Sequence, residues 1–253
     1  MHAPIAQRNG WLRTIAAGSE ATFHVVCFPP AGGGSGAFSG LRRAVGPNVR
    51  CTFIILPGRD SRFAEPMQLN MYEVADEVVR ALSAVIQRPA IPYIVLGLSM
   101  GGVLAYEAAL RIASVGLQRP MRVVVAGTPS PTHQVWRLTA EMDPTELMIA
   151  TQGVRAEVFE SAELAQIASS ALAADQRMMA AYRCGGQKLD VPLTVMLGTE
   201  DPLVTDVMAV GWEQLGTAGI TFRPFAGGHF FLDRYYPQLL AEWQLEAAEL
   251  AHA

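Results

Sequence analysis

The sequence has few charged residues, few cysteines and no long hydrophobic segment. Only 17% of its 253 residues are charged and the formal net charge is -4, so no overall positive charge attracts nucleic acid. No segment reaches the ~18 uninterrupted apolar residues of a membrane-spanning helix, and residues 1–11 contain no apolar run that could form a signal-peptide core. These absences predict a cytoplasmic protein that binds neither nucleic acid nor membrane.

The three cysteines also exclude more than they suggest. Cys27, Cys51 and Cys184 form no CxxC pair and lack the spacing of metal ligands. We expect Cys27 and Cys51 to lie in strands and Cys184 near a Gly-Gly turn. Buried thiols without a chemical role are therefore the favoured interpretation, and no metal site is predicted.

The apolar residues make up 51% of the chain, which is enough for a well-buried core in one domain over residues 1–253. From residue 20 onward, short runs rich in β-branched residues alternate with longer helical patterns. Continuously apolar runs are typical of strands buried on both faces of a parallel sheet. The expected strands are residues 23–28, 50–56, 93–98, 121–127, 191–198 and 220–225. The predicted class is a doubly wound α/β fold, with a mostly parallel central sheet and helices on both faces.

One interval interrupts this alternation. Residues 131–186 contain no strand pattern, whereas the stretch 163–182 is rich in Ala and Met and reads as helical. An insertion at this point in the chain is where a lid would lie. An additional packing layer without a gating role explains the pattern equally well.

The most informative segment surrounds Ser99. The apolar run at residues 93–98 leads into Gly97-Leu98-Ser99-Met100-Gly101, and a helical pattern follows. This is the strand-turn-helix context of a nucleophile elbow, in which a sharp turn lifts the serine clear of the sheet. The alternative is a tight turn with an unreactive serine.

A nucleophilic serine needs a base, and the base needs an orienting acid. His229 follows Gly227-Gly228 in the loop after the last expected strand, whereas His2 and His252 lie at the chain ends. The hydrolase order of serine, acid and histidine places the acid in Gly198-Thr199-Glu200-Asp201-Pro202. We select Asp201, because Pro202 would hold it in the turn, and keep Glu200 as the alternative. Asp201 could also cap the following helix.

The loop after the first expected strand has two interpretations. As part of an oxyanion hole, Phe28-Pro29-Pro30-Ala31-Gly32-Gly33-Gly34 would supply a backbone N–H from Ala31, with Gly32 possible, beside that of Met100. As a dinucleotide fingerprint, Gly32-x-Gly34-x-x-Ala37 is incomplete, because the second strand ends at Leu56-Pro57-Gly58 rather than on an acidic residue.

These motifs together resemble the type II thioesterases, the stand-alone editing hydrolases of polyketide and nonribosomal peptide synthesis. The similarity covers nearly the whole chain. It includes Cys27-Phe28-Pro29-Pro30-Ala31-Gly32-Gly33, Leu56-Pro57-Gly58-Arg59 with Arg62 and Glu65-Pro66, the elbow, and Gly228-His229-Phe230-Phe231-Leu232. The resemblance implies an α/β-hydrolase fold with a helical lid, and it maps a triad onto Ser99, Asp201 and His229. Two positions depart from the family, since Leu98 replaces a usual His and Pro30 a frequent His or Tyr.

The resemblance also implies the substrate and the partner. The acyl group would arrive as a thioester on the phosphopantetheine arm of an acyl or peptidyl carrier protein, in antibiotic or siderophore biosynthesis. No cofactor of the enzyme itself is expected. Because carrier proteins are usually acidic, we expect basic residues to dock them, with Arg42, Arg43, Arg59 and Arg62 as candidates. A general carboxylesterase or lipase-like hydrolase and a non-hydrolytic nucleotide-binding or interaction protein are the alternatives.

Overall fold

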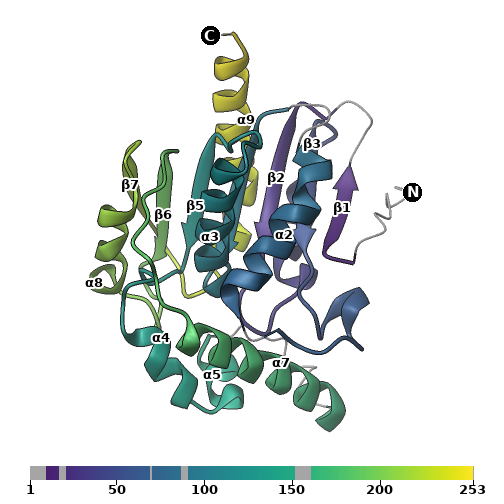
Figure 1. The fold of residues 1–253 in the computed structure, drawn as a ribbon, viewed down its shortest axis with the longest axis vertical. Helices are drawn as coiled ribbons and strands as arrows, with labels where there is room; N and C mark the ends of the chain where they lie inside the picture. The colour runs from purple at the N-terminus through teal and green to yellow at the C-terminus, as the bar shows by residue number, and fades with distance from the viewer. Residues whose placement is uncertain (1–9, 17–20, 69, 87–90, 152–160, 253) are drawn as a thin grey trace.

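The structure is a computed structural model that describes residues 10–16, 21–68, 70–86, 91–151 and 161–252. Seven strands of these residues form a single sheet in the order β1-β3-β2-β4-β5-β6-β7 (Figure 1). Strand β1 pairs antiparallel with β3, and every other neighbouring pair is parallel. The strands are β1 (Leu12–Ala16), β2 (Phe23–Phe28), β3 (Val49–Ile54), β4 (Tyr93–Leu98), β5 (Arg122–Ala126), β6 (Leu193–Gly198) and β7 (Ile220–Phe225). The predicted fold class is therefore confirmed.

Helices pack on both faces of the sheet (Figure 1). On one face α2 and α3 bury apolar side chains against the strands, and on the other face α1 and α9 do the same. Side chains of β2 and β4 alternate between these two clusters, which is why their sequences are mostly apolar. These helices are α1 (Ser39–Ala44), α2 (Met71–Ile86), α3 (Met100–Ser114) and α9 (Tyr236–His252), and the short α8 (Asp206–Ala209) follows β6.

The described residues of the interval 131–186 form helices and loops, with no strand among them. The interval contains α4 (Val135–Leu138), a 3-10 turn (Thr139–Glu141), α5 (Pro144–Thr151) and α7 (Ala162–Ala181). The side chain of Ser161 caps α7 by accepting the Leu164 N–H at 3.4 Å. Figure 1 shows these helices at the lower end of the sheet, where the parallel strands end. The expected helical insertion is present, and whether it gates access stays a prediction.

The main error of the sequence analysis is at the N-terminus. Strand β1 was not predicted, although Leu12 and Trp11 are buried and β1 completes one edge of the sheet. The six expected strands are present, with ends that shift by at most two residues. Cys27 and Cys51 are free and buried in strands β2 and β3, as expected.

In the part of the chain that the structure describes, every helix is too short or too polar to cross a bilayer.

Candidate active site

Ser99 lies at the sharp turn between β4 and α3. Its backbone has φ +50° and ψ -121°, a conformation that is costly for any residue with a side chain. The Ser99 N–H donates to the carbonyl of Ala126 at 2.8 Å, and the Ser99 carbonyl accepts from the buried Thr128 hydroxyl at 3.0 Å. The end of β5 therefore holds the strained turn in place. Sequence reasoning missed Thr128, because no local pattern marks a hydroxyl that bonds to a turn 29 residues away.

The two glycines of the elbow are required by close packing. A Cβ atom on Gly97 would collide with the backbone of Gly101, and one on Gly101 would collide with the carbonyl oxygen of Phe28. Strand β4 and helix α3 can approach each other and strand β2 this closely only without these side chains. The motif is therefore a structural requirement of the turn that presents Ser99.

His229 and Asp201 form a buried pair beside this turn. Nδ1 of His229 lies 2.8 Å from Oδ2 of Asp201, and their side chains are 4% and 0% exposed. The other oxygen of Asp201 accepts the backbone N–H groups of Leu203 at 2.8 Å and Val204 at 3.2 Å. Asp201 thus orients the imidazole and also holds its own turn. It does not cap a helix, because the next helix, α8, begins at Asp206 and has Thr205 as its N-cap. Glu200, the alternative acid, is exposed.

The residues at the end of β5 contact both Ser99 and His229. Gly127 has φ +55°, and a Cβ atom there would lie 3.4 Å from two atoms of the His229 ring. The ring therefore rests against the residue that follows Ala126, the hydrogen-bond partner of Ser99. Within the described residues the Ser99 hydroxyl has no hydrogen-bond partner. Catalytic hydrogen bonds are often long in free enzymes and shorten when substrate binds.

The predicted oxyanion donors differ in their availability. Met100 is the first residue of α3, so its N–H has no acceptor within the helix. Gly32, the less favoured second donor, gives its N–H to the carboxylate of Asp175 at 2.8 Å. The N–H of Ala31 makes no hydrogen bond to any residue that the structure describes. The geometry therefore favours Ala31 over Gly32.

The same loop is a poor dinucleotide site. Its N–H groups would have to face a pyrophosphate, but that of Gly32 is bound to Asp175 and that of Ser35 donates to Asp60 at 2.7 Å. Two carboxylates at these positions repel a phosphate. The helix that follows is also short, since α1 ends at Ala44.

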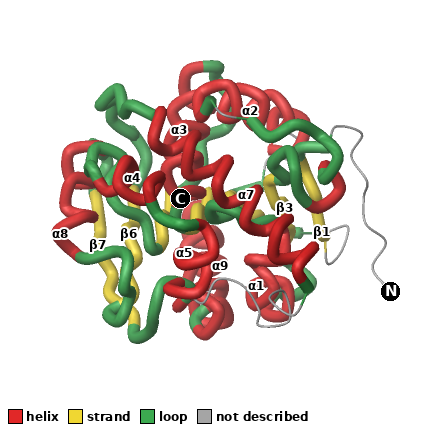
Figure 2. The backbone as a smooth tube through the Cα atoms, turned by 90° about the horizontal axis from the view of Figure 1, so that it is seen from below, coloured by secondary structure: helices red, strands yellow, loops and turns green. Residues whose placement is uncertain are grey.

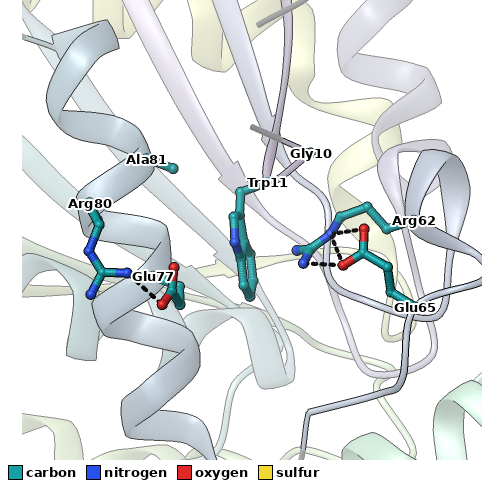
Figure 3. Close-up of a pocket in the computed structure, with 7 residues that line it drawn as sticks. All are labelled: Gly10, Trp11, Arg62, Glu65, Glu77, Arg80 and Ala81. Carbon is teal, nitrogen blue, oxygen red and sulfur yellow. Dashed lines mark hydrogen bonds and ion pairs between the residues drawn. The ribbon is translucent and has the colours of Figure 1, made fainter. Parts of the chain in front are cut away.

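Two of the four arginines proposed for docking are buried, which corrects that expectation. Arg59 is 7% exposed and pairs with Asp175, and Arg62 is 8% exposed. The Arg62 guanidinium lies 3.8 Å from the centre of the Trp11 ring and 2.6 Å from the Glu65 carboxylate (Figure 3). The sequence shows that these residues are charged but does not reveal such partners. Arg42 and Arg43 are exposed and stay candidates.

The chain order of serine, then aspartate, then histidine on a mostly parallel sheet is that of the α/β-hydrolases. A model of the thioesterase domain matches residues 23–242, and the chain belongs to this thioesterase domain family. The resemblance to type II thioesterases that the sequence suggested is confirmed by these comparisons.

Individual relatives agree with this assignment. The chain is 31% identical to a probable cadicidin biosynthesis thioesterase of Streptomyces griseus over 89% of its own length, and it spans 62% of the length of that relative. The structure is similar to the RedJ thioesterase of the prodiginine pathway of Streptomyces coelicolor, with a TM-score of 0.78, 27% identity, and coverage of 95% and 96% of the two chains. It is also similar to BorB, a type II thioesterase from the borrelidin cluster, with a TM-score of 0.77, 30% identity, and coverage of 94% and 99%.

Proposed function

We propose that this chain is a serine thioesterase that hydrolyses acyl thioesters on the phosphopantetheine arm of carrier proteins in polyketide or nonribosomal peptide biosynthesis. The observation that carries the proposal is the buried His229–Asp201 hydrogen bond beside the strained Ser99, in a chain of the thioesterase domain family. Its similarity to thioesterases of cadicidin, prodiginine and borrelidin biosynthesis supports the substrate class.

The first half of the reaction acylates Ser99. The hydroxyl oxygen of Ser99 attacks the thioester carbonyl carbon while Nε2 of His229 accepts the hydroxyl proton. Asp201 stabilises the imidazolium through its hydrogen bond to Nδ1. The N–H groups of Met100 and Ala31 stabilise the oxyanion. The carbon–sulfur bond then breaks, and His229 returns its proton to the departing thiolate of the phosphopantetheine arm.

The second half releases the acid. His229 removes a proton from a water molecule, whose oxygen attacks the acyl-serine carbonyl in the same oxyanion hole. The ester bond to Ser99 breaks, and His229 returns the proton to the Ser99 oxygen. The products are a carboxylic acid and a free carrier thiol.

The test compares an acetyl-loaded carrier protein with a matched oxygen ester, each with the wild-type protein and with Ser99→Ala. We expect Ser99-dependent release that favours the carrier thioester. Ser114→Ala, which removes an exposed serine at the end of the same helix, is the matched control and should keep full activity. Undiminished hydrolysis by Ser99→Ala would contradict the nucleophile. Faster cleavage of the oxygen ester would favour the general esterase, and no labelling by a fluorophosphonate probe would favour a non-hydrolytic protein.

A further inference from the structure

A buried ion pair that the proposed mechanism does not use joins the loop after β3 to helix α7. The guanidinium of Arg59 contacts both carboxylate oxygens of Asp175, at 2.6 Å and 3.0 Å. The two side chains are 8% and 3% exposed. Bidentate pairs of this kind fix geometry as well as contribute energy. The pair therefore fixes where α7 lies relative to the strand ends.

The same pair holds the loop that contains Ala31. Oδ2 of Asp175 accepts the N–H of Gly32 at 2.8 Å, and Nη1 of Arg59 donates to the carbonyl of Gly33 at 3.2 Å. Gly32 has φ +68°, and a Cβ atom there would lie 3.0 Å from the Cβ of Leu172 on α7. The helix thus packs directly on the loop and bonds to it on the C-terminal side of Ala31.

This loop needs such support for a physical reason. Ala31 is followed by three glycines, which have little conformational preference of their own. An oxyanion donor is effective only when its N–H is held 2.7–3.1 Å from the position of the developing charge, so a mobile loop would lose much of the benefit.

From these contacts we infer that Asp175 is a positioning residue for the oxyanion hole. By holding the Gly32 N–H, Asp175 fixes the peptide that follows Ala31 and so aims the Ala31 N–H at the site, while Arg59 holds Asp175 and Gly33. Helix α7 is then part of the catalytic geometry rather than only a cover over the strand ends (Figure 2). This inference rests on the proposed thioesterase function.

The test uses the full chain and a small pantetheine thioester, so that carrier docking plays no part. Asp175→Asn keeps the shape of the side chain but removes the negative charge and so weakens the ion pair with Arg59. The double variant Arg59→Met, Asp175→Leu removes both charges without leaving one buried alone, and frees the Gly32 N–H. We expect kcat to fall about 10- to 100-fold in the double variant, with KM changed by less than about 3-fold. Affinity for a trifluoromethyl ketone, which forms a tetrahedral adduct, should fall by the same factor as kcat.

The matched control is Tyr182→Phe. Tyr182 is the C-cap residue of α7, and its hydroxyl donates to Glu107 on α3. The substitution therefore removes a contact that holds the end of the same helix, without changing any contact of the loop. We expect this variant to keep wild-type kcat and ketone affinity. A folded double variant with unchanged kcat and ketone affinity would overturn the inference, as would equal losses in Tyr182→Phe. Failure of the proposed function is distinguishable, because the wild-type protein itself would then not hydrolyse the thioester.

Discussion

Asp201 holds His229 with one carboxylate oxygen and its own turn with the other. Oδ2 lies 2.8 Å from His229 Nδ1, and Oδ1 accepts the N–H groups of Leu203 and Val204. Because the two oxygens have different partners, one substitution can remove the contact with His229 alone and another can remove both contacts. Comparing the two substitutions separates the effect on catalysis from the effect on stability.

The first prediction compares Asp201→Asn with Asp201→Ala. The Asn oxygen can still accept the two backbone N–H groups, but its NH2 group is a donor and faces Nδ1 of His229. This favours the imidazole tautomer that carries its proton on Nε2, which cannot accept the proton of Ser99. We expect kcat to fall about 10³- to 10⁴-fold in Asp201→Asn with little loss of stability. Asp201→Ala should lose as much activity and, in addition, about 1–2 kcal/mol of unfolding free energy. Steady-state kinetics and urea unfolding measure the two effects.

The control for this prediction is the neighbouring carboxylate. Glu200 is exposed, so Glu200→Gln should leave both kcat and the unfolding free energy unchanged. If Glu200→Gln lost activity and Asp201→Asn did not, the assignment of the acid would be wrong.

The second prediction concerns the strained backbone of Ser99. Because φ is +50° there, Ser99→Gly should be more stable than Ser99→Ala, by about 1 kcal/mol in unfolding free energy. Ser114 is the last residue of α3 and carries no such strain, so there the order should reverse: Ser114→Ala should be more stable than Ser114→Gly, by up to about 1 kcal/mol. Urea unfolding of the four variants makes the comparison. The same order at both positions would mean that the Ser99 turn stores no strain.

The third prediction concerns docking of the carrier protein. Arg42 and Arg43 are exposed on α1, which follows the Ala31 loop and packs against the turn Phe231–Arg234 just after His229. Changing both to Glu should raise KM for an acidic carrier-bound thioester about 10-fold at low salt, and less at high salt, because exposed charges are screened. KM for a pantetheine thioester should not change.

Arg80→Glu provides the control for docking, because Arg80 is an exposed arginine on α2. It should leave KM for the carrier-bound thioester unchanged. Equal effects of the α1 substitutions on the carrier-bound and the small thioester would remove the docking role.

The sequence predicted the parts of the fold and site that depend on local patterns. Strand β4 and the turn at Ser99 follow from an apolar run and two glycines, and His229 and Asp201 follow from the order of loops along the chain. Strand β1 was missed because it is short, lies at an edge and includes the exposed Arg13. An edge strand of this kind lacks the continuous apolar run that marks the buried strands.

Contacts between distant segments could not be predicted in this way. Asp175 lies in an Ala- and Met-rich helix, 143 residues from its partner Gly32 and 116 from Arg59. Nothing near Asp175 in the sequence signals either bond. For the same reason the sequence alone suggests a docking role for Arg59, since it shows the charge of a residue but not its partner.

The last prediction concerns stability at low pH. His24 is 1% exposed and bonds to the Thr52 hydroxyl at 2.9 Å, and burial, together with the positive charge of Arg50, lowers its pKa from 6.5 to about 3. Between pH 6.5 and about 3 the unfolded chain therefore binds a proton that the folded protein excludes. The contribution of His24 is fully present above pH 6.5 and is lost as the pH falls, by up to ~1.4 kcal/mol per pH unit. His24→Gln, which can still bond to Thr52, should show a correspondingly shallower loss between pH 6 and 4 in urea unfolding, and a constant difference from wild type above pH 7. Parallel curves over the whole range would show that His24 is not held neutral by the fold.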